Sequence, residues 1–171
     1  MKSVFLVGFM GSGKTTIGKE VAQKIGYQHL DLDVFIGNKY HKTVSQIFAE
    51  VGESEFRNLE RKALQEVIEF EQCVISTGGG TPCFFDNMQQ ITSHGICFYL
   101  EADSKVLADR LFYKGCKRPL LAGKNKEELL DYIEKTIAQR ECFYRQAQTI
   151  IDANDTQVAI DQICEFLEKE K

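Results

Sequence analysis

Proline is scarce in this chain, with 2 among 171 residues, whereas phenylalanine contributes 12 residues and tyrosine 6. With 43% apolar residues, the chain can offset the backbone entropy lost on folding by burying a core, which excludes wholesale disorder. The length suits one domain, on a prior of roughly 100–200 residues apiece. We therefore expect a single folded domain that spans residues 1–171.

Long apolar runs and an excess of positive charge are also missing. The longest run, Val4 to Met10, is interrupted by Gly8 and is far shorter than the ~20 residues that a membrane helix needs. One lysine precedes it and no cleavage site follows, so we expect no signal peptide. Lysine and arginine number 21 against 25 acidic residues, a net charge of −4. This balance predicts no nucleic-acid or membrane partner, and any phosphate site is expected to be local.

None of the 6 cysteines forms a C-x-x-C pair. Without an export signal, cysteines in a chain of this size are expected to be reduced thiols rather than disulfides. These features predict a cytoplasmic protein.

Short β-branched apolar runs alternate with longer helical stretches, which predicts an α/β fold with a parallel sheet covered on both faces. The predicted strands are Ser3–Val7, Gln28–Leu32, Cys73–Thr77, Ile96–Leu100 and Thr149–Asp152. The predicted helices are Lys14–Ile25, Val44–Glu50, Glu53–Phe70, Phe85–Thr92, Ser104–Phe112, Lys126–Gln146 and Val158–Lys169. Apolar residues at three- and four-residue spacing predict a buried face for the third helix, formed by Phe56, Leu59, Ala63, Val67 and Phe70.

The segment Gly8 to Thr15 fits G-x-x-x-x-G-K-[ST] in full, between a predicted strand and a predicted helix. This context is typical of a P-loop, in which backbone N–H groups and a helix N-terminus hold a polyphosphate. Lys14 is expected to reach the β- and γ-phosphates of ATP, and Thr15 to place its hydroxyl on Mg²⁺. Thr16 supports either the α-phosphate or the helix start. The remaining loop residues expected to contact the nucleotide are Gly11, Ser12 and Gly13.

The other motifs of the sequence narrow the class of P-loop protein. A GTPase would carry N-K-x-D, but the segments 38–41 and 125–128 both lack the aspartate. A helicase or recombinase would need more chain and a basic surface that tracks a strand. A small-molecule kinase remains the best interpretation, and a non-catalytic ATP sensor is the alternative from another class.

Polar groups gather where the second and third strands end, at the edge where α/β sheets bind ligands. Asp31 and Asp33 are predicted to lie on one side of an extended backbone. One would support Mg²⁺ through water and the other would orient an acceptor hydroxyl, unless both serve as helix caps. Ser76, where many P-loop proteins have an acidic residue, is a further candidate for a water-mediated metal contact.

The run Gly78-Gly79-Gly80 follows the third strand and lets the backbone approach a small ligand closely. On the predicted third helix, Arg57 precedes Glu60 by three residues. This spacing suits either a surface ion pair or a guanidinium held for an anionic ligand.

Six motifs together resemble the shikimate kinase family, in that family's order over nearly the whole chain. They are Gly8 to Thr16, Asp31-x-Asp33, Phe56-Arg57-x-x-Glu60, Gly78-Gly79-Gly80, Arg118-Pro119-Leu120-Leu121 and Arg140-x-x-x-Tyr144. The resemblance implies a single-domain P-loop kinase whose five-stranded parallel sheet has the order 2-3-1-4-5. It also implies transfer of the ATP γ-phosphoryl group to the 3-hydroxyl of shikimate, in the chorismate pathway to aromatic amino acids.

The same resemblance assigns roles to individual residues. Asp33 would bind the shikimate hydroxyls as base or positioner, and Asp31 would support Mg²⁺ through water. Arg57 and Arg140 would bind the substrate carboxylate, with Glu60 holding Arg57. Backbone contacts to the substrate would come from Gly79 and Gly80, and nucleotide contacts from Arg110 and from the turn that contains Asn154.

Two segments are expected to be specialised: a substrate-binding region at about 33–61 and a lid at about 112–124. The lid is basic, bounded by glycines and without helical periodicity, and Arg118 would close over the phosphates. A different small-molecule kinase, such as a gluconate-type enzyme, remains the alternative within the same class. The negative charge and the lack of an exposed apolar stripe favour a monomer.

Overall fold

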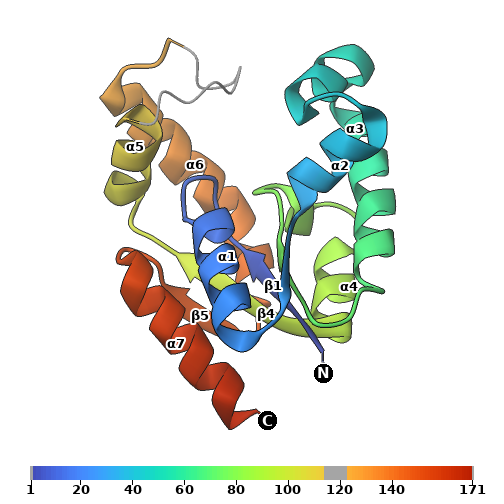
Figure 1. Ribbon diagram of the computed structural model, residues 1–171. Helices are drawn as coiled ribbons and strands as arrows, with labels where there is room; N and C mark the ends of the chain where they lie inside the picture. Colours follow the sequence, from blue (N-terminus) through green and yellow to red (C-terminus); the bar gives the residue numbers. More distant parts are fainter. Residues whose placement is uncertain (1, 114–122, 171) are drawn as a thin grey trace.

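A parallel sheet forms the centre of the molecule (Figure 1). The structure is a computed structural model, and it describes residues 2–113 and 123–170. Within these ranges the sheet has five strands in the order β2-β3-β1-β4-β5, and every neighbouring pair is parallel. The strands are β1 (Ser3–Val7), β2 (Gln28–Asp31), β3 (Cys73–Ser76), β4 (Gly95–Glu101) and β5 (Thr149–Asp152). The predicted sheet and its order are confirmed, with β1 at the centre.

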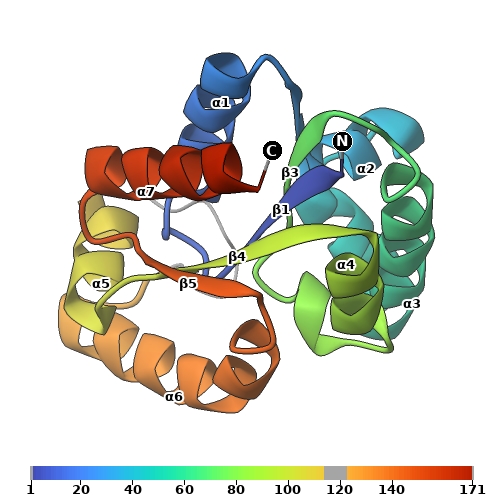
Figure 2. The ribbon, with the colours of Figure 1, turned by 90° about the horizontal axis from the view of Figure 1, so that it is seen from below.

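Helices cover both faces of this sheet. In Figure 2, α1 and α7 lie on one face, and α3, α4 and α6 lie on the other. The helices are α1 (Lys14–Ile25), α2 (Leu32–Tyr40), α3 (Val44–Val67), α4 (Asn87–His94), α5 (Ser104–Tyr113), α6 (Lys126–Tyr144) and α7 (Thr156–Lys169), with a 3₁₀ turn η1 (Thr81–Cys83).

The central strand β1 is buried along its whole length, and its side chains alternate between two cores. Val4 and Leu6 contribute to the core beneath α1 and α7. Phe5 and Val7 contribute to the core beneath α3 and α4. Apolar burial of this extent stabilises the fold by about 25 cal/mol for each Å² removed from water. The result is a rigid strand whose carboxyl end, at Val7, leads directly into the P-loop.

A third apolar cluster joins the P-loop to α5 and α6. Phe9 and Met10 of the loop pack with Leu111 of α5 and Ile133 of α6. In Figure 1, α5 and α6 rise on one side of the N-terminus of α1, and α2 and α3 rise on the other. The P-loop therefore lies between two helical pairs.

The sequence analysis was wrong about the chain after β2. The strand predicted to include Leu32 ends at Asp31, whose Oδ1 accepts hydrogen bonds from the backbone N–H groups of Asp33 (3.0 Å) and Val34 (3.3 Å). An aspartate that accepts these bonds caps a helix. Helix α2 therefore begins here, and it escaped prediction because it buries only Leu32 and Ile36 and has little helical periodicity.

The buried face predicted for the third helix is shorter than expected. Helix α3 ends at Val67, and Phe70 is 43% exposed beyond it. The break predicted between two helical stretches is present at Gly52, whose φ of 79° and ψ of 173° are not helical. Such a positive φ is unstrained in glycine because it lacks a Cβ.

The cysteines in the described ranges, at positions 73, 83, 97, 142 and 164, are free thiols. Among the helices of residues 2–113 and 123–170, none combines the length and apolarity needed to cross a membrane.

Candidate active site

The P-loop has the backbone conformation that close approach to phosphate requires. Gly11 and Gly13 have φ values of 81° and 95°, which side chains with a Cβ rarely adopt. Lys14 is only 8% exposed, and its Nζ donates to the carbonyl oxygens of Gly8 (2.8 Å) and Phe9 (2.9 Å). These contacts hold the ammonium group against the inner side of the loop, next to the N-terminus of α1.

Ser12, in the same loop, has a fully buried hydroxyl that finds no hydrogen-bond partner among residues 2–113 and 123–170. Buried polar groups are nearly always paired, so an orphaned one calls for an explanation. A loop built to hold phosphate oxygens supplies one, because its hydrogen-bonding groups are directed towards a ligand rather than towards each other.

Thr15 and Asp31 meet at the mouth of the loop. The Thr15 hydroxyl donates to Asp31 Oδ2 at 2.6 Å, while Oδ1 of the same carboxylate caps α2. Thr15 is exposed and Asp31 is half-buried, and Mg²⁺ prefers a small number of such oxygen ligands together with phosphate oxygens and water. The donor set therefore fits the predicted metal. Asp31 is both the cap and the metal candidate, two roles that the sequence left as alternatives.

Ser76 lies beside the start of α1, and it is the register partner of Asp31 on the neighbouring strand. Its hydroxyl donates to the carbonyl oxygen of Lys14 at 2.8 Å and lies 3.0 Å from His29 Nε2. Burial is the main cause that lowers the pKa of His29, although Asp31 opposes it. Ser76 is 1% exposed. Its water-mediated contact with a metal ion stays a prediction. The tie to Lys14 escaped sequence analysis because it joins residues 62 positions apart.

Arg57 and Glu60 form a buried pair, which excludes the surface ion pair among the two interpretations of their spacing. Arg57 Nη1 donates to Glu60 Oε1 at 2.9 Å, and the two residues are 9% and 1% exposed. Thr81 of η1 donates its hydroxyl to the other carboxylate oxygen of Glu60 at 2.8 Å. Glu60 is thus held from two sides, and it fixes the guanidinium of Arg57. No local pattern in the sequence indicates the contribution of Thr81, which lies 21 residues from Glu60.

The glycine run lies directly against both predicted carboxylate-binding arginines. A Cβ at Gly80 would lie 2.6 Å from Nη2 of Arg57, and one at Gly79 would lie 3.5 Å from Nη1 of Arg140. A Cβ at Gly79 would also lie 3.3 Å from the backbone nitrogen of Met10 in the P-loop. A Cβ at Gly80 would crowd the guanidinium of Arg57, whereas the contact of a Cβ at Gly79 with Arg140 would be an ordinary van der Waals one. Two guanidinium groups therefore converge on one short loop beside the phosphate-binding loop.

Two further groups complete this side of the site. A Cβ at Gly78 would lie 3.0 Å from Asp33 Oδ1, so Asp33 reaches the same glycine run. Tyr144, at the end of α6, is fully buried and donates its hydroxyl to the carbonyl oxygen of Gly79 at 2.5 Å. Burial raises the pKa of Tyr144 well above its usual range, with Arg140 opposing the shift. The tyrosine remains neutral and ties the helix that carries Arg140 to the glycine run.

On the far side of the P-loop, Arg110 of α5 joins the loop to the turn after β5. Its guanidinium donates to the carbonyl oxygens of Ala153 and Asn154, both at 2.9 Å, and of Gly11 at 3.3 Å. Asn154 Oδ1 accepts from the backbone N–H of Asp103 at 2.9 Å. The residues predicted to contact the nucleotide base are thus gathered at one edge of the P-loop.

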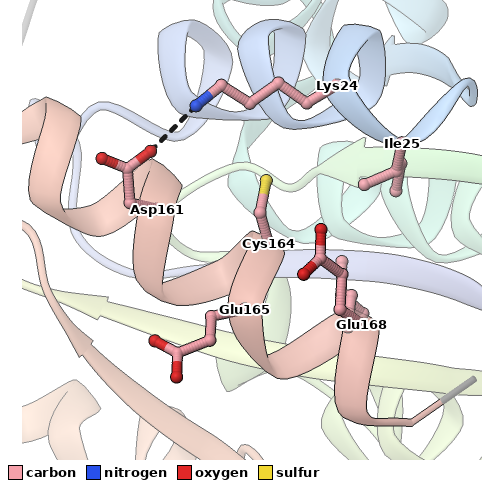
Figure 3. Close-up of a pocket in the computed structure, with 7 residues that line it drawn as sticks. Lys24, Ile25, Asp161, Cys164, Glu165 and Glu168 are labelled. Carbon is pink, nitrogen blue, oxygen red and sulfur yellow. Dashed lines mark hydrogen bonds and ion pairs between the residues drawn. The ribbon is translucent and has the colours of Figure 1, made fainter.

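One surface depression lies away from the cluster of predicted site residues, and another reaches its edge at Asp33. One, of about 420 Å³, is lined by Lys24, Cys164 and neighbouring residues between α1 and α7 (Figure 3). Lys24 stands near the opposite end of α1 from the P-loop, so this depression holds none of the predicted site residues. The other, of about 770 Å³, extends from Asp33 along α2 but is not lined by Arg57 or Arg140. Arg118, with residues 114–122 of the lid predicted at about 112–124, lies outside the described residues.

The buried Glu60 predicts a pH effect. Burial raises the pKa of its carboxyl, while the charge and hydrogen bond of Arg57 and the hydrogen bond of Thr81 lower it. As the pH falls through this raised pKa, protonated Glu60 loses its hold on Arg57, and the KM for an acidic substrate should increase. Thr81→Val removes one hydrogen-bond donor to the carboxylate, which raises the pKa of Glu60 further. As the pH falls, the KM of this variant should therefore begin to increase at a higher pH than the KM of wild type. Identical KM profiles for both proteins between about pH 5 and 8 would contradict this.

The comparisons with known proteins agree on one family. The family model described as shikimate kinase matches residues 10–169. A shikimate kinase from Parabacteroides distasonis is 51% identical over 153 residues, which cover 90% of this chain and 88% of the relative. The solved shikimate kinase from Bacteroides thetaiotaomicron has a TM-score of 0.94 at 43% identity, and the match covers 98% of each chain. The one from Acinetobacter baumannii, in complex with shikimate, has a TM-score of 0.89 at 31% identity over 100% of this chain and 95% of its own. The chain therefore belongs to the shikimate kinase family.

Proposed function

We propose that this protein transfers the γ-phosphoryl group of ATP to the 3-hydroxyl of shikimate, giving shikimate 3-phosphate and ADP. One observation carries the proposal: Arg57 and Arg140 converge on Gly80 and Gly79, and Gly79 abuts Met10 of the P-loop. A carboxylate held by the two arginines would place the rest of a small acid next to the γ-phosphate. Bidentate, charge-assisted hydrogen bonds make arginine the preferred partner of a carboxylate.

In this reaction the oxygen of the acceptor hydroxyl forms a bond to the γ-phosphorus, and the bond to the bridging β,γ-oxygen breaks. The hydroxyl proton leaves towards the Asp33 carboxylate, which accepts its hydrogen bond. Lys14 stabilises charge on the transferring phosphoryl group, whose loose transition state spreads charge over its oxygens. Most of the rate enhancement comes from positioning and electrostatics, because the protein forms no covalent intermediate.

Thr15, and Asp31 through water, would hold Mg²⁺, with Ser76 as a further water-mediated contact. When bound, the metal neutralises charge on the β- and γ-phosphates. Arg110 and the turn at Asn154 would contact the nucleotide base, and Thr16 the α-phosphate. The lid proposed at about 112–124 rests on the composition of that segment, and the proposed role of Arg118 rests on the family resemblance. We further propose one kinase domain with a substrate-binding region at about 33–61, acting as a cytoplasmic monomer.

The decisive experiment measures ADP release from ATP and Mg²⁺ with and without shikimate. Release that depends on shikimate, with shikimate 3-phosphate as the product, supports the proposal. Release with gluconate but not with shikimate would indicate a different small-molecule kinase. No acceptor-dependent release from a protein that binds ATP would indicate a nucleotide sensor.

A further inference from the structure

We propose that Phe84 is a positioning residue for Arg57, acting as an aromatic platform that sets the plane in which the guanidinium meets the substrate carboxylate. The inference rests on the proposed function, which makes Arg57 a carboxylate-binding residue. It concerns a segment between the glycine run and α4 that none of the sequence motifs covers. Phe84 follows η1 directly and is half-buried beside α3.

The contact itself is close. Arg57 Cζ lies 4.1 Å from the centre of the Phe84 ring, whereas it lies 5.3 Å from that of Phe56. A guanidinium within about 6 Å of a ring centre is attracted to the negative face of the ring, and more strongly where water is excluded. Arg57 is only 9% exposed, so water screens this attraction little.

The platform adds a constraint that Glu60 cannot supply. Glu60 holds one nitrogen of Arg57, Nη1, through a single hydrogen bond of 2.9 Å, which leaves the guanidinium plane able to tilt about that contact. The second acidic neighbour, Glu53, is 3.6 Å from Nη2, too far for a hydrogen bond to fix the plane. The Phe84 ring, whose centre lies 4.1 Å from Cζ, restricts this tilt. The plane matters because bidentate recognition of a carboxylate depends on it.

The segment that carries Phe84 is itself anchored to the site. Asn87, which is fully buried, donates its Nδ2 to the carbonyl oxygen of Thr81 at 2.8 Å, and the Thr81 hydroxyl donates to Glu60. One short segment thus contacts both members of the Arg57–Glu60 pair, through Thr81 on the carboxylate and Phe84 on the guanidinium.

The backbone after Phe84 is strained in a way that suits this arrangement. Phe85 has a φ of 52°, in the left-handed region that aromatic residues rarely adopt. Its ring is exposed and lies 4.9 Å from Arg61 Cζ, one helical turn beyond Arg57 on α3. Consecutive phenylalanines thus lie against consecutive arginines of one helix face. Strained residues persist where the surroundings hold them, and they gather at ligand-binding sites.

The test compares Phe84→Leu, which keeps an apolar side chain but removes the aromatic face, with Phe84→Tyr, which restores it. For Phe84→Leu we expect the KM for shikimate to increase about tenfold, the size of a desolvated cation–π contact, with kcat and the KM for ATP within about twofold of wild type. Phe84→Tyr should return the KM for shikimate to within about twofold of wild type. A merely structural role would not give this division between KM and kcat, nor rescue by tyrosine.

Phe85→Leu is the matched control, because it removes a ring from Arg61 in the same segment. We expect it to raise the KM for shikimate less than threefold, on the order of the effect of an exposed contact. An effect as large as that of Phe84→Leu would overturn the proposal, since loosening of the segment would then explain both. An unchanged KM in Phe84→Leu would overturn it as well.

Arg57→Ala, measured in parallel, separates failure of this inference from failure of the proposed function. If Arg57→Ala raises the KM for shikimate and Phe84→Leu does not, only the platform is refuted. If Arg57→Ala leaves that KM unchanged, Arg57 does not bind the substrate carboxylate, and both proposals about this residue are refuted.

Discussion

Replacing Lys14 by methionine is expected to lower kcat by about a hundredfold or more, while the melting temperature stays within about 4 °C. The ammonium group lies inside the P-loop, where in the proposed reaction it would face the charge that develops on the transferring phosphoryl group. Methionine has a similar length but no charge. Loss of the hydrogen bonds to two carbonyl oxygens destabilises the variant, whereas removal of a buried charge stabilises it. The two effects on folding stability therefore oppose each other.

Steady-state kinetics and thermal melting check this expectation. Lys24→Met is the matched control, because Lys24 lies on the same helix, pairs with Asp161 at the surface and is 45% exposed. Its kcat should equal that of wild type. Near-normal turnover in Lys14→Met would contradict the P-loop assignment, whereas a large loss of melting temperature would point to a structural role for the lysine.

Asp33→Asn is expected to lower kcat by about a hundredfold, in line with the usual contribution of a positioned proton acceptor. Asparagine keeps the shape of the side chain but loses the charge that strengthens a hydrogen bond from the acceptor hydroxyl. Helix α2 should survive the change, because its cap is formed by Asp31. Residue 33 contributes its backbone N–H to this cap and not its side chain. The KM for ATP should change less than about twofold, since the proposed site holds the nucleotide on the other side of the reacting bond.

Separate titrations of shikimate and ATP distinguish the possible results for Asp33. Asp131→Asn on the surface of α6, where the carboxylate pairs with Lys135 and is 62% exposed, is the control and should behave as wild type. If Asp33→Asn keeps its turnover, the carboxylate has no part in the transfer. If Asp33→Asn weakens the binding of ATP as much as the binding of shikimate, Asp33 belongs to the nucleotide site.

The sequence analysis identified the parts of the protein that local patterns determine. The P-loop was recognisable because its glycines, lysine and threonine are consecutive in the chain and their backbone conformation is local. The strands were predicted because each is a short, β-branched apolar run. Most helices were predicted because the longer stretches between these runs have a helical pattern. The exceptions have the same origin: α2 has almost no periodic apolar face, and Phe70 continued the pattern of α3 beyond the end of that helix.

The sequence by itself determined the fold class, the phosphate-binding loop and, through resemblance, the residues expected around the substrate. Only the tertiary structure decided how these residues are held. It buried Glu60 against Arg57, directed Thr81 from 21 residues away to the same carboxylate, and placed Phe84 beneath the guanidinium. Spacing along the chain left the Arg57–Glu60 pair equally suited to the surface. The structure shows that the pair is buried. Burial depends on which distant segments pack over a side chain, and a local sequence pattern does not predict this packing.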